Sequence, residues 1–382
     1  MTKPTQSPST APTPPSELAL RVSPLAGVTF SLFIAAAFAS CAWLMIKGPI
    51  EFVPKVVTQD MLLHGDLTHR FAKTLSDAVI PKRAADLERG ASWLAFGDLG
   101  PRVREGCADW LFLTDELRLN RNAPLNARAK AQAVIDLQHS LASRGIQLVV
   151  AVVPDKSRIA AAQLCSLTRP ASLAPRIGDW LTMLQGAGVP AVDLTPTLQP
   201  LGESAYLRTD THWSETGAKA AAGRVAQAIS ALQFSATPHK AFDLTAQASA
   251  VRPGDLVRLA GIDWLPVSWQ PKPEYIAATQ IKERMEATGG ADDLDDLFGD
   301  NNLPNTALIG TSFSRNSNFV GFLEAALGAP VGNFAKDGGE FSGAAKGYLE
   351  SPAFTQTPPK LVVWEIPERD LQTPYADDVR LP

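Results

Sequence analysis

Two short strings, some hundred residues apart, contain the side chains best suited to chemistry. The first, Arg208-Thr-Asp-Thr-His-Trp213, places the carboxylate of Asp210 two residues before the imidazole of His212. The second, Gly310-Thr-Ser-Phe-Ser314, offers the hydroxyl of Ser312. A serine hydroxyl is a weak nucleophile until a histidine, itself held by a carboxylate, takes its proton, and such sets recur on unrelated folds. The strings therefore predict serine-dependent acyl chemistry.

The position of Ser312 agrees with this prediction, although a second interpretation exists. An apolar run, Thr306-Ala-Leu-Ile-Gly310, precedes it and is typical of a strand. In open α/β sheets, ligands bind beyond the carboxyl ends of the strands, where Ser312 would lie. Alternatively, Ser312 or Ser314 caps a helix that begins near Arg315.

His212 is the best candidate for a general base, because a base needs its second ring nitrogen held by an acceptor. The alternatives are a core histidine with a charged neighbour, or a metal ligand. The other histidines lack a comparable setting, so we predict neither a metal nor a cofactor; they are His64, His69, His139 and His239.

The surrounding chain alternates strand-like and helix-like stretches. Pro124 can open a helix that Gly145 closes. Another helix is expected at residues 180–184, and Ser214 can cap a third. Apolar runs predict strands at residues 146–153, 189–194, 307–310 and 361–366. The alternation favours an α/β fold with a parallel sheet and helices on both faces.

Residues 252–300 break this alternation and form an expected insertion. It carries an acidic cluster, Asp292, Asp293, Asp295 and Asp296. A solvated loop is the simpler interpretation. Calcium binding is the alternative, but the spacing and glycine of an EF-hand are absent.

Near the N-terminus, residues 25–46 contain no charge and are long enough to cross a bilayer. A cleaved signal peptide usually has a shorter apolar region, and a lipidated Cys41 is a weaker possibility, so we predict an uncleaved anchor. The Pro/Ser/Thr-rich residues 1–24 cannot build a core and are expected to be a disordered cytoplasmic tail. Residues 47–95 then form a stem, and residues 96–382 an exported catalytic domain.

Composition narrows the function classes. The 382 residues carry a formal net charge of −4, which gives no electrostatic case for binding nucleic acid. No two cysteines have the short spacing of a zinc site. Cys107 and Cys165 could pair outside the cytoplasm; two reduced, buried thiols fit equally well.

The chain resembles the periplasmic alginate O-acetylation family of AlgJ and AlgX. The Asp-Thr-His-Trp and Gly-Thr-Ser-x-Ser strings are the more specific part of this resemblance. Five stretches carry it: Asp109-Trp-Leu-Phe-Leu113, Val153-Pro-Asp-Lys-Ser-Arg158, Tyr206-Leu-Arg-Thr-Asp-Thr-His-Trp213, Gly310-Thr-Ser-Phe-Ser314 and Pro359-Lys-Leu-Val-Val-Trp-Glu-Ile-Pro-Glu-Arg369.

The resemblance implies an SGNH-hydrolase-like, three-layer fold with Ser312 as nucleophile, His212 as base and Asp210 as its orienter. The acid and base precede the serine, the order of a circularly permuted member. The implied oxyanion or substrate groups are Gly338, Gly339, Ser314 and Arg369. An ion pair between Arg369 and Glu365 is the alternative for that arginine, because no Gly-x-Asn-Asp block is present.

The function that the resemblance implies is O-acetylation of an exported polysaccharide, alginate-like or another exopolysaccharide, through an acetyl-serine. It also implies a multi-spanning membrane O-acyltransferase as the acetyl supplier and a place in the bacterial inner membrane with the catalytic domain in the periplasm. A polysaccharide acetylesterase and a non-catalytic scaffold of a synthesis complex are the alternatives. The chain ends at Pro382, too soon for a carbohydrate-binding module, so the resemblance is expected to be closer to AlgJ.

Overall fold

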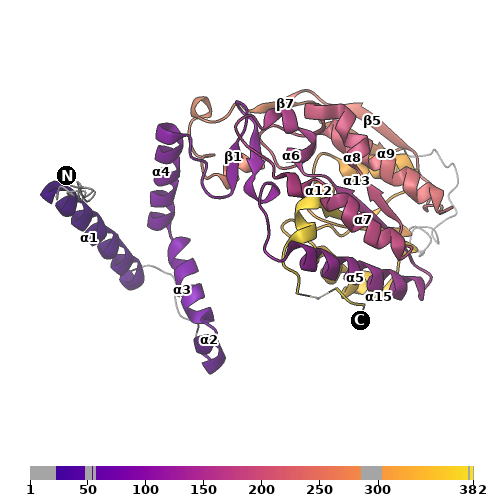
Figure 1. Ribbon diagram of the computed structural model, residues 1–382, viewed down its shortest axis with the longest axis horizontal. Coiled ribbons are helices and arrows are strands. Elements are labelled where there is room, and N and C mark those ends of the chain that lie inside the picture. The colour runs from indigo at the N-terminus through magenta and orange to yellow at the C-terminus, as the bar shows by residue number, and fades with distance from the viewer. Residues whose placement is uncertain (1–22, 48–53, 55–56, 285–302, 377–378, 382) are drawn as a thin grey trace, which may run out of the picture. The chain divides into compact units, whose positions relative to one another are not determined.

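The computed structural model describes residues 23–47, 54, 57–284, 303–376 and 379–381. The chain divides into two compact units, residues 1–85 and 86–382. Figure 1 shows the helices and strands of both. The acidic cluster of the expected insertion lies outside the described residues.

In the first unit, helix α1 (Pro24–Lys47) has the length and apolar composition needed to cross a membrane, and most of its apolar side chains are exposed. The structure thus has a helix at residues 25–46, where the sequence predicts one, and it fits either a membrane anchor or a signal sequence. Short helices α2 (Gln59–Leu63) and α3 (Asp66–Ser76) follow. Helix α4 (Val79–Phe96) continues into the second unit.

The second unit is built on a five-stranded sheet whose strands are all parallel. The strand order is β10-β9-β11-β3-β4. The bounds are β3 (Gln147–Val153), β4 (Ala191–Asp193), β9 (Thr306–Ile309), β10 (Gly332–Asn333) and β11 (Leu361–Pro367). The four predicted strands are confirmed, and β10 was not predicted because two residues leave no pattern.

Helices cover both faces of this sheet and make three layers (Figure 1). Successive side chains of a strand point to opposite faces. Accordingly Val150 and Val152 join one core cluster, together with α5 (Ala123–Ala142) and α7 (Arg176–Gly186). Val149 and Ala151 join the other cluster, with α9 (Glu215–Ala231) and α13 (Phe319–Leu327). Burial on both faces explains why the strands read as continuous apolar runs. The predicted α/β class is confirmed.

Shorter elements connect these layers. The cap predicted at Ser214 is present, since its hydroxyl accepts a hydrogen bond from Gly217 N at 3.1 Å. The helix expected near Arg315 begins earlier, at Ser312, because Thr311 is its cap. The remaining α-helices among the described residues are α6 (Lys156–Ile159), α8 (Thr195–Leu198), α10 (Asp255–Leu259), α12 (Ser312–Arg315), α14 (Gly343–Leu349) and α15 (Pro352–Gln356).

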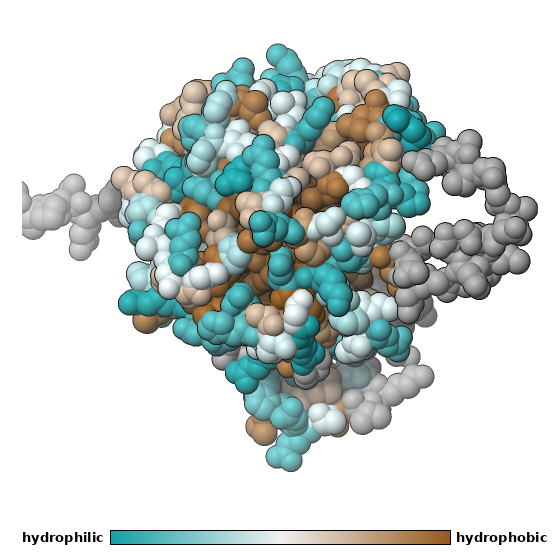
Figure 2. Space-filling model, turned by 90° about the vertical axis from the view of Figure 1, so that its right-hand side faces the viewer, coloured by the Kyte–Doolittle hydropathy of each residue, from teal (hydrophilic) through white to brown (hydrophobic). Residues whose placement is uncertain are grey.

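Three antiparallel strand pairs were not predicted. They are β1 (Val103–Glu105) with β2 (Leu111–Leu113), β5 (Phe242–Ala246) with β8 (Thr279–Glu283), and β6 (Ala250–Arg252) with β7 (Glu274–Ile276). The last two pairs show that the expected insertion is folded over its described residues. On the face shown in Figure 2, hydrophilic and hydrophobic residues are interspersed.

The second unit also contains a disulfide between Cys107 and Cys165, 58 residues apart in sequence. Of the two states left open by the sequence, the structure therefore has the oxidised one. The bond ties the segment between β1 and β2 to the chain that follows α6.

Candidate active site

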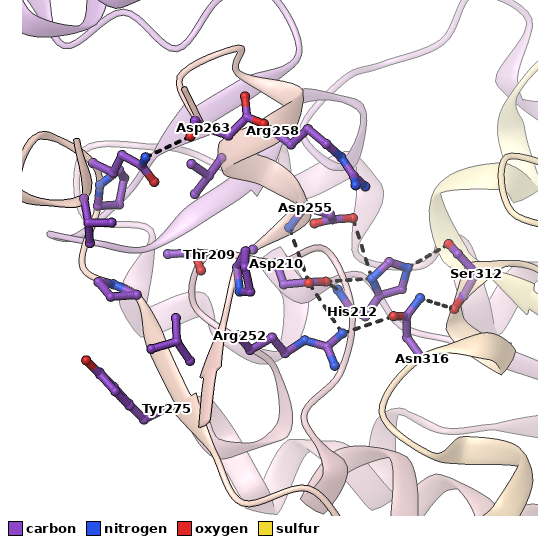
Figure 3. A pocket seen from close by; sticks show the side chains of 18 of the residues that line it. Thr209, Asp210, His212, Arg252, Asp255, Arg258, Asp263, Tyr275, Ser312 and Asn316 are labelled. Atoms are coloured by element: carbon purple, nitrogen blue, oxygen red, sulfur yellow. Dashed lines mark hydrogen bonds and ion pairs between the residues drawn. The ribbon is translucent and has the colours of Figure 1, made fainter. Parts of the chain in front are cut away.

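Asp210, His212 and Ser312 form one continuous hydrogen-bonded line (Figure 3). The Asp210 Oδ1 atom lies 2.6 Å from His212 Nδ1, and His212 Nε2 lies 2.7 Å from Ser312 Oγ. The imidazole and the carboxylate are both buried. The structure thus brings together the three residues that the sequence singled out, in the geometry of a nucleophile, a base and the acid that orients the base.

The turn that carries Ser312 follows strand β9 and packs against a buried carboxylate. Glu365 of β11 accepts hydrogen bonds from Thr311 N at 2.7 Å and from Ser314 Oγ at 3.0 Å. A Cβ atom on Gly310 would lie 2.6 Å from Glu365 Oε2, so only glycine lets the turn approach this closely. Burial raises the pKa of Glu365, and the hydrogen bonds from Thr311 and Ser314 oppose that rise. Ser312 is therefore presented by a fixed backbone.

Lys156 binds the loop that carries Asp210 and His212. Its buried ammonium donates to the backbone carbonyls of Leu111, Arg208 and Asp210 at 2.6, 2.7 and 3.0 Å. Three N–H donors therefore meet three acceptors. The Val153–Arg158 and Asp109–Leu113 stretches of the sequence, whose role the sequence alone did not reveal, meet at this lysine.

Residues of the expected insertion also form hydrogen bonds with this loop. Glu274 of β7 accepts from the amides of Arg208 and Thr209, both at 2.9 Å. Asp255, at the start of α10, accepts from Thr211 N at 2.6 Å. A Cβ atom on Gly254 would lie 2.0 Å from Thr209 O. The loop's backbone groups thus find partners that are more than forty residues away in sequence.

A second carboxylate faces the imidazole. Asp255 Oδ2 lies 3.6 Å from His212 Nδ1, beyond the 2.6 Å of Asp210. Burial opposes ionisation of Asp210, but the hydrogen bond from His212, the charge of that ring and Arg252 together hold the pKa of Asp210 below its ordinary value. Burial, and then the charge of Asp210, raise the pKa of Asp255. Asp210 is therefore the acid that stays charged beside His212.

The ligand-type atoms of Asp210, His212 and Asp255 lie within 4.8 Å of one another. They already have other partners: both carboxylates face the same imidazole nitrogen, and each accepts a backbone N–H as well. The arrangement suits the orientation of a histidine base better than the binding of a cation.

Ser312 lies where two cavities meet. The larger, of about 1030 Å³, contains His212 and is walled by the insertion, including Arg252, Asp255 and Tyr275 (Figure 3). The smaller, of about 430 Å³, contains Arg369. Ser312 and Gly338 line both. A substrate can therefore reach the hydroxyl with one part beside the histidine and another beside the arginine.

The other sequence-predicted site residues divide into two groups. Gly338 and Arg369 reach the site, and Arg369 Nη1 is buried without a hydrogen-bond partner among the described residues. Gly339 and Ser314 line neither cavity. The Gly339 amide donates to Lys336 O, and the Ser314 hydroxyl donates to Glu365. The ion pair considered between Glu365 and Arg369 is not among the ion pairs of the described residues.

Sequence reasoning missed Arg252, Asp255, Asn316 and Lys156 as site residues. Only Lys156 had a signal, because it lies in one of the five stretches that resemble the family. The other three are brought to the site by the insertion and by the end of α12, which no local pattern indicates.

Comparisons with known proteins agree with this geometry. A sequence model of the family described as "SGNH hydrolase-like domain, acetyltransferase AlgX" matches residues 103–368. Probable alginate O-acetylase AlgJ of Azotobacter vinelandii is 32% identical over 337 residues, which cover 86% of this chain and 85% of that protein. Its counterpart in Pseudomonas aeruginosa is 32% identical over 328 residues, 83% of this chain and 82% of the relative.

A solved structure gives the same result for the fold. The O-acetyltransferase domain of Pseudomonas putida AlgJ superposes with a TM-score of 0.61 at 29% identity, covering 72% of this chain and 94% of that domain. An AlgX relative from Pseudomonas putida, 34% identical, is matched over 67% of this chain and 54% of its own length. The resemblance predicted from sequence and its SGNH-like fold are confirmed. The chain belongs to the AlgX/AlgJ family of SGNH hydrolase-like O-acetyltransferases and is closer to AlgJ than to AlgX.

Proposed function

We propose that this protein transfers an acetyl group to a hydroxyl of an exported polysaccharide, alginate or a related exopolysaccharide, through an acetyl-serine at Ser312. The observation that carries the proposal is the unbroken line from Asp210 through His212 to the Ser312 hydroxyl, open to a cavity large enough for a sugar ring. The names of the AlgJ relatives support the acetyl group and the polymer.

The reaction has two balanced steps. In the first, His212 Nε2 takes the proton of the Ser312 hydroxyl, the serine oxygen attacks the acetyl carbonyl, and His212 returns the proton to the departing oxygen as its bond to the acetyl carbon breaks. In the second, His212 takes the proton of a sugar hydroxyl, that oxygen attacks the acetyl-serine, and the proton returns to Ser312. Asp210 holds the imidazole in one orientation throughout.

The residues of the two cavities indicate how the acetyl ester is oriented at Ser312. The larger contains His212, so the leaving and attacking oxygens belong there. The smaller contains Arg369, with its unpartnered Nη1, so the carbonyl oxygen belongs there. The amides of Ser312 and Gly338 make no hydrogen bond within the described part of the chain, and both residues border this cavity. Each correctly placed oxyanion donor contributes about 3 kcal/mol of barrier reduction.

The remaining parts of the proposal concern place and partners. Helix α1 supports a single-pass anchor in the bacterial inner membrane, with residues 1–24 in the cytoplasm and the catalytic unit in the periplasm. The Cys107–Cys165 disulfide supports an oxidising compartment. Because acetyl-CoA is cytoplasmic, we propose that a multi-spanning membrane O-acyltransferase supplies the acetyl group.

The test is to incubate the protein with an activated acetyl ester, with and without an acceptor oligosaccharide. We expect a mass increase of one acetyl on the peptide containing Ser312, which disappears when oligosaccharide is added as acetylated sugar forms. Ser312→Ala should abolish both signals, and Ser143→Ala, at an exposed position after α5, should keep them. Release of free acetate without sugar acetylation would instead identify an acetylesterase. Unchanged polymer acetylation in cells carrying Ser312→Ala would identify a scaffold.

A further inference from the structure

Arg252 connects the two halves of the site. It is the last residue of β6, in the insertion, and its side chain is mostly buried. One of its guanidinium nitrogens, Nη2, lies 3.6 Å from Asp210 Oδ2 and donates to Asn316 Oδ1 at 3.1 Å (Figure 3). The first contact belongs to the loop of the acid and base, and the second to the segment that carries the nucleophile.

Asn316 extends this link to the nucleophile itself. Its Nδ2 donates to the carbonyl oxygen of Ser312 at 2.8 Å. An asparagine amide has one accepting and one donating end, and the two contacts use one each, so they fix a single orientation of the amide. A chain of polar contacts thus runs from the Asp210 carboxylate through Arg252 and Asn316 to the Ser312 backbone.

Among the described residues, other contacts also join the two halves, but none of them reaches the Asp210 carboxylate and the Ser312 carbonyl together. The Ser317 hydroxyl donates to the backbone carbonyl of Trp213 at 2.6 Å. The ring of Phe313 packs edge-on against His212 and Trp213, with centroids 5.1 Å apart in both cases. Such apolar contacts are not directional in the way that a hydrogen bond is. The contacts of Arg252 and Asn316 hold the Asp210 carboxylate and the Ser312 backbone. The relative placement of these two groups sets the distance from the His212 imidazole to the Ser312 hydroxyl.

We propose that Arg252 is a positioning residue, which acts through Asp210 and Asn316 to hold the base and the nucleophile at reacting distance. The inference rests on the proposed function, because it takes Ser312 as the nucleophile. A displacement of about 1 Å in such a pair costs up to a hundredfold in rate. The insertion is then a working part of the catalytic unit rather than a surface loop.

The experiment measures how fast a fluorophosphonate probe labels Ser312 in the full chain, with the maximal rate and the half-saturating concentration determined separately. We expect Arg252→Gln to lower the maximal rate about thirtyfold and to leave the half-saturating concentration unchanged, since the probe lacks a sugar. Asn316→Ala should show the same pattern. Because the two act in series, the double variant should lose no more than the worse single variant.

Arg284→Gln is the matched control, since Arg284 is an exposed guanidinium of the same insertion that pairs with Asp243. It should label like the wild type. A full maximal rate in Arg252→Gln, a loss confined to the half-saturating concentration, or losses that multiply in the double variant would each overturn the role of Arg252. If Arg252→Gln fails to fold by circular dichroism, Asn316→Ala decides by the same criterion. Labelling of the wild type at a residue other than Ser312 would overturn the proposed function itself.

Discussion

Removing Asp210 tests whether the second carboxylate has a share in orienting the base. Asp210→Ala deletes the acceptor 2.6 Å from His212 Nδ1, but it leaves Asp255 Oδ2 at 3.6 Å from the same nitrogen. Alanine is the better replacement because asparagine can present a donor to the ring and trap the wrong tautomer. We expect Asp255 to take over part of the role of Asp210.

The distances set the size of the effect. With an effective dielectric constant of about 20, a unit charge at the Asp210 distance stabilises the imidazolium by about 6 kcal/mol, and one at the Asp255 distance by about 5 kcal/mol. The charge of Asp210 is one cause of the raised pKa of Asp255, so we expect Asp255 to take up the negative charge once Asp210 is removed. The loss is then the difference between the two energies before rounding, about 2 kcal/mol, which corresponds to about a twentyfold to thirtyfold loss of rate. Asp255→Ala alone should cost about threefold or less, because the nearer carboxylate remains. The double variant should lose about 10⁴-fold, as triads without their acid do.

The assay is kcat/KM for hydrolysis of an activated acetyl ester at pH 7, with thermal unfolding of each variant as a check that it is folded. The decisive quantity is the ratio of kcat/KM between Asp210→Ala and the double variant. If Asp210→Ala alone already loses 10⁴-fold, Asp255 contributes nothing to the base, and the argument from its distance is refuted.

Three further outcomes can be measured. Gly310→Ala, whose Cβ would lie 2.6 Å from a carboxylate oxygen, should lose about 1–3 kcal/mol of stability in urea unfolding and at least tenfold in kcat, whereas Gly178→Ala, with open space around it, should lose neither. Replacing Cys107 and Cys165 with serine opens a loop of 58 residues and should cost about 4 kcal/mol in the same unfolding experiment; an unchanged midpoint would contradict this. Burial lowers the pKa of Lys156 to about 8, so kcat/KM should fall above that pH as one of its three carbonyl contacts is lost, and Lys156→Met should lack this step. Between pH 8 and 10.5 the Lys156 amine binds more protons in the unfolded chain than in the folded one. Lys156 should therefore make the folded state more stable as the pH rises through this range. A fall of kcat/KM above pH 8 is then not caused by unfolding.

The sheet was predictable from sequence because its strands are buried on both sides. Residues 147–153 and 361–367 read as continuous apolar runs for that reason, and Ser312 could be placed at the end of such a run. The pairing of Asp210 with His212 was also predictable, because two residues that close in sequence lie near each other in any fold. Ser312 was a candidate from its position after the apolar run, and the family resemblance favoured it over the helix-cap interpretation.

The contribution of the insertion was not predictable. Its short strands lack a clear alternation, and Asp255 meets Thr211 across 44 residues of sequence. A partly buried carboxylate in such a segment is indistinguishable, in sequence, from a solvated one. The same holds for Arg252, whose importance depends on a contact with Asn316 that is 64 residues away.

The placement of His212 in the larger cavity alone has a kinetic consequence. The oxygen that leaves the donor and the oxygen that attacks from the sugar must each stand beside the same ring nitrogen, so the two molecules exclude each other. Double-reciprocal plots at different acceptor concentrations should then be parallel, and a large excess of acceptor should slow turnover by occupying the unacetylated site.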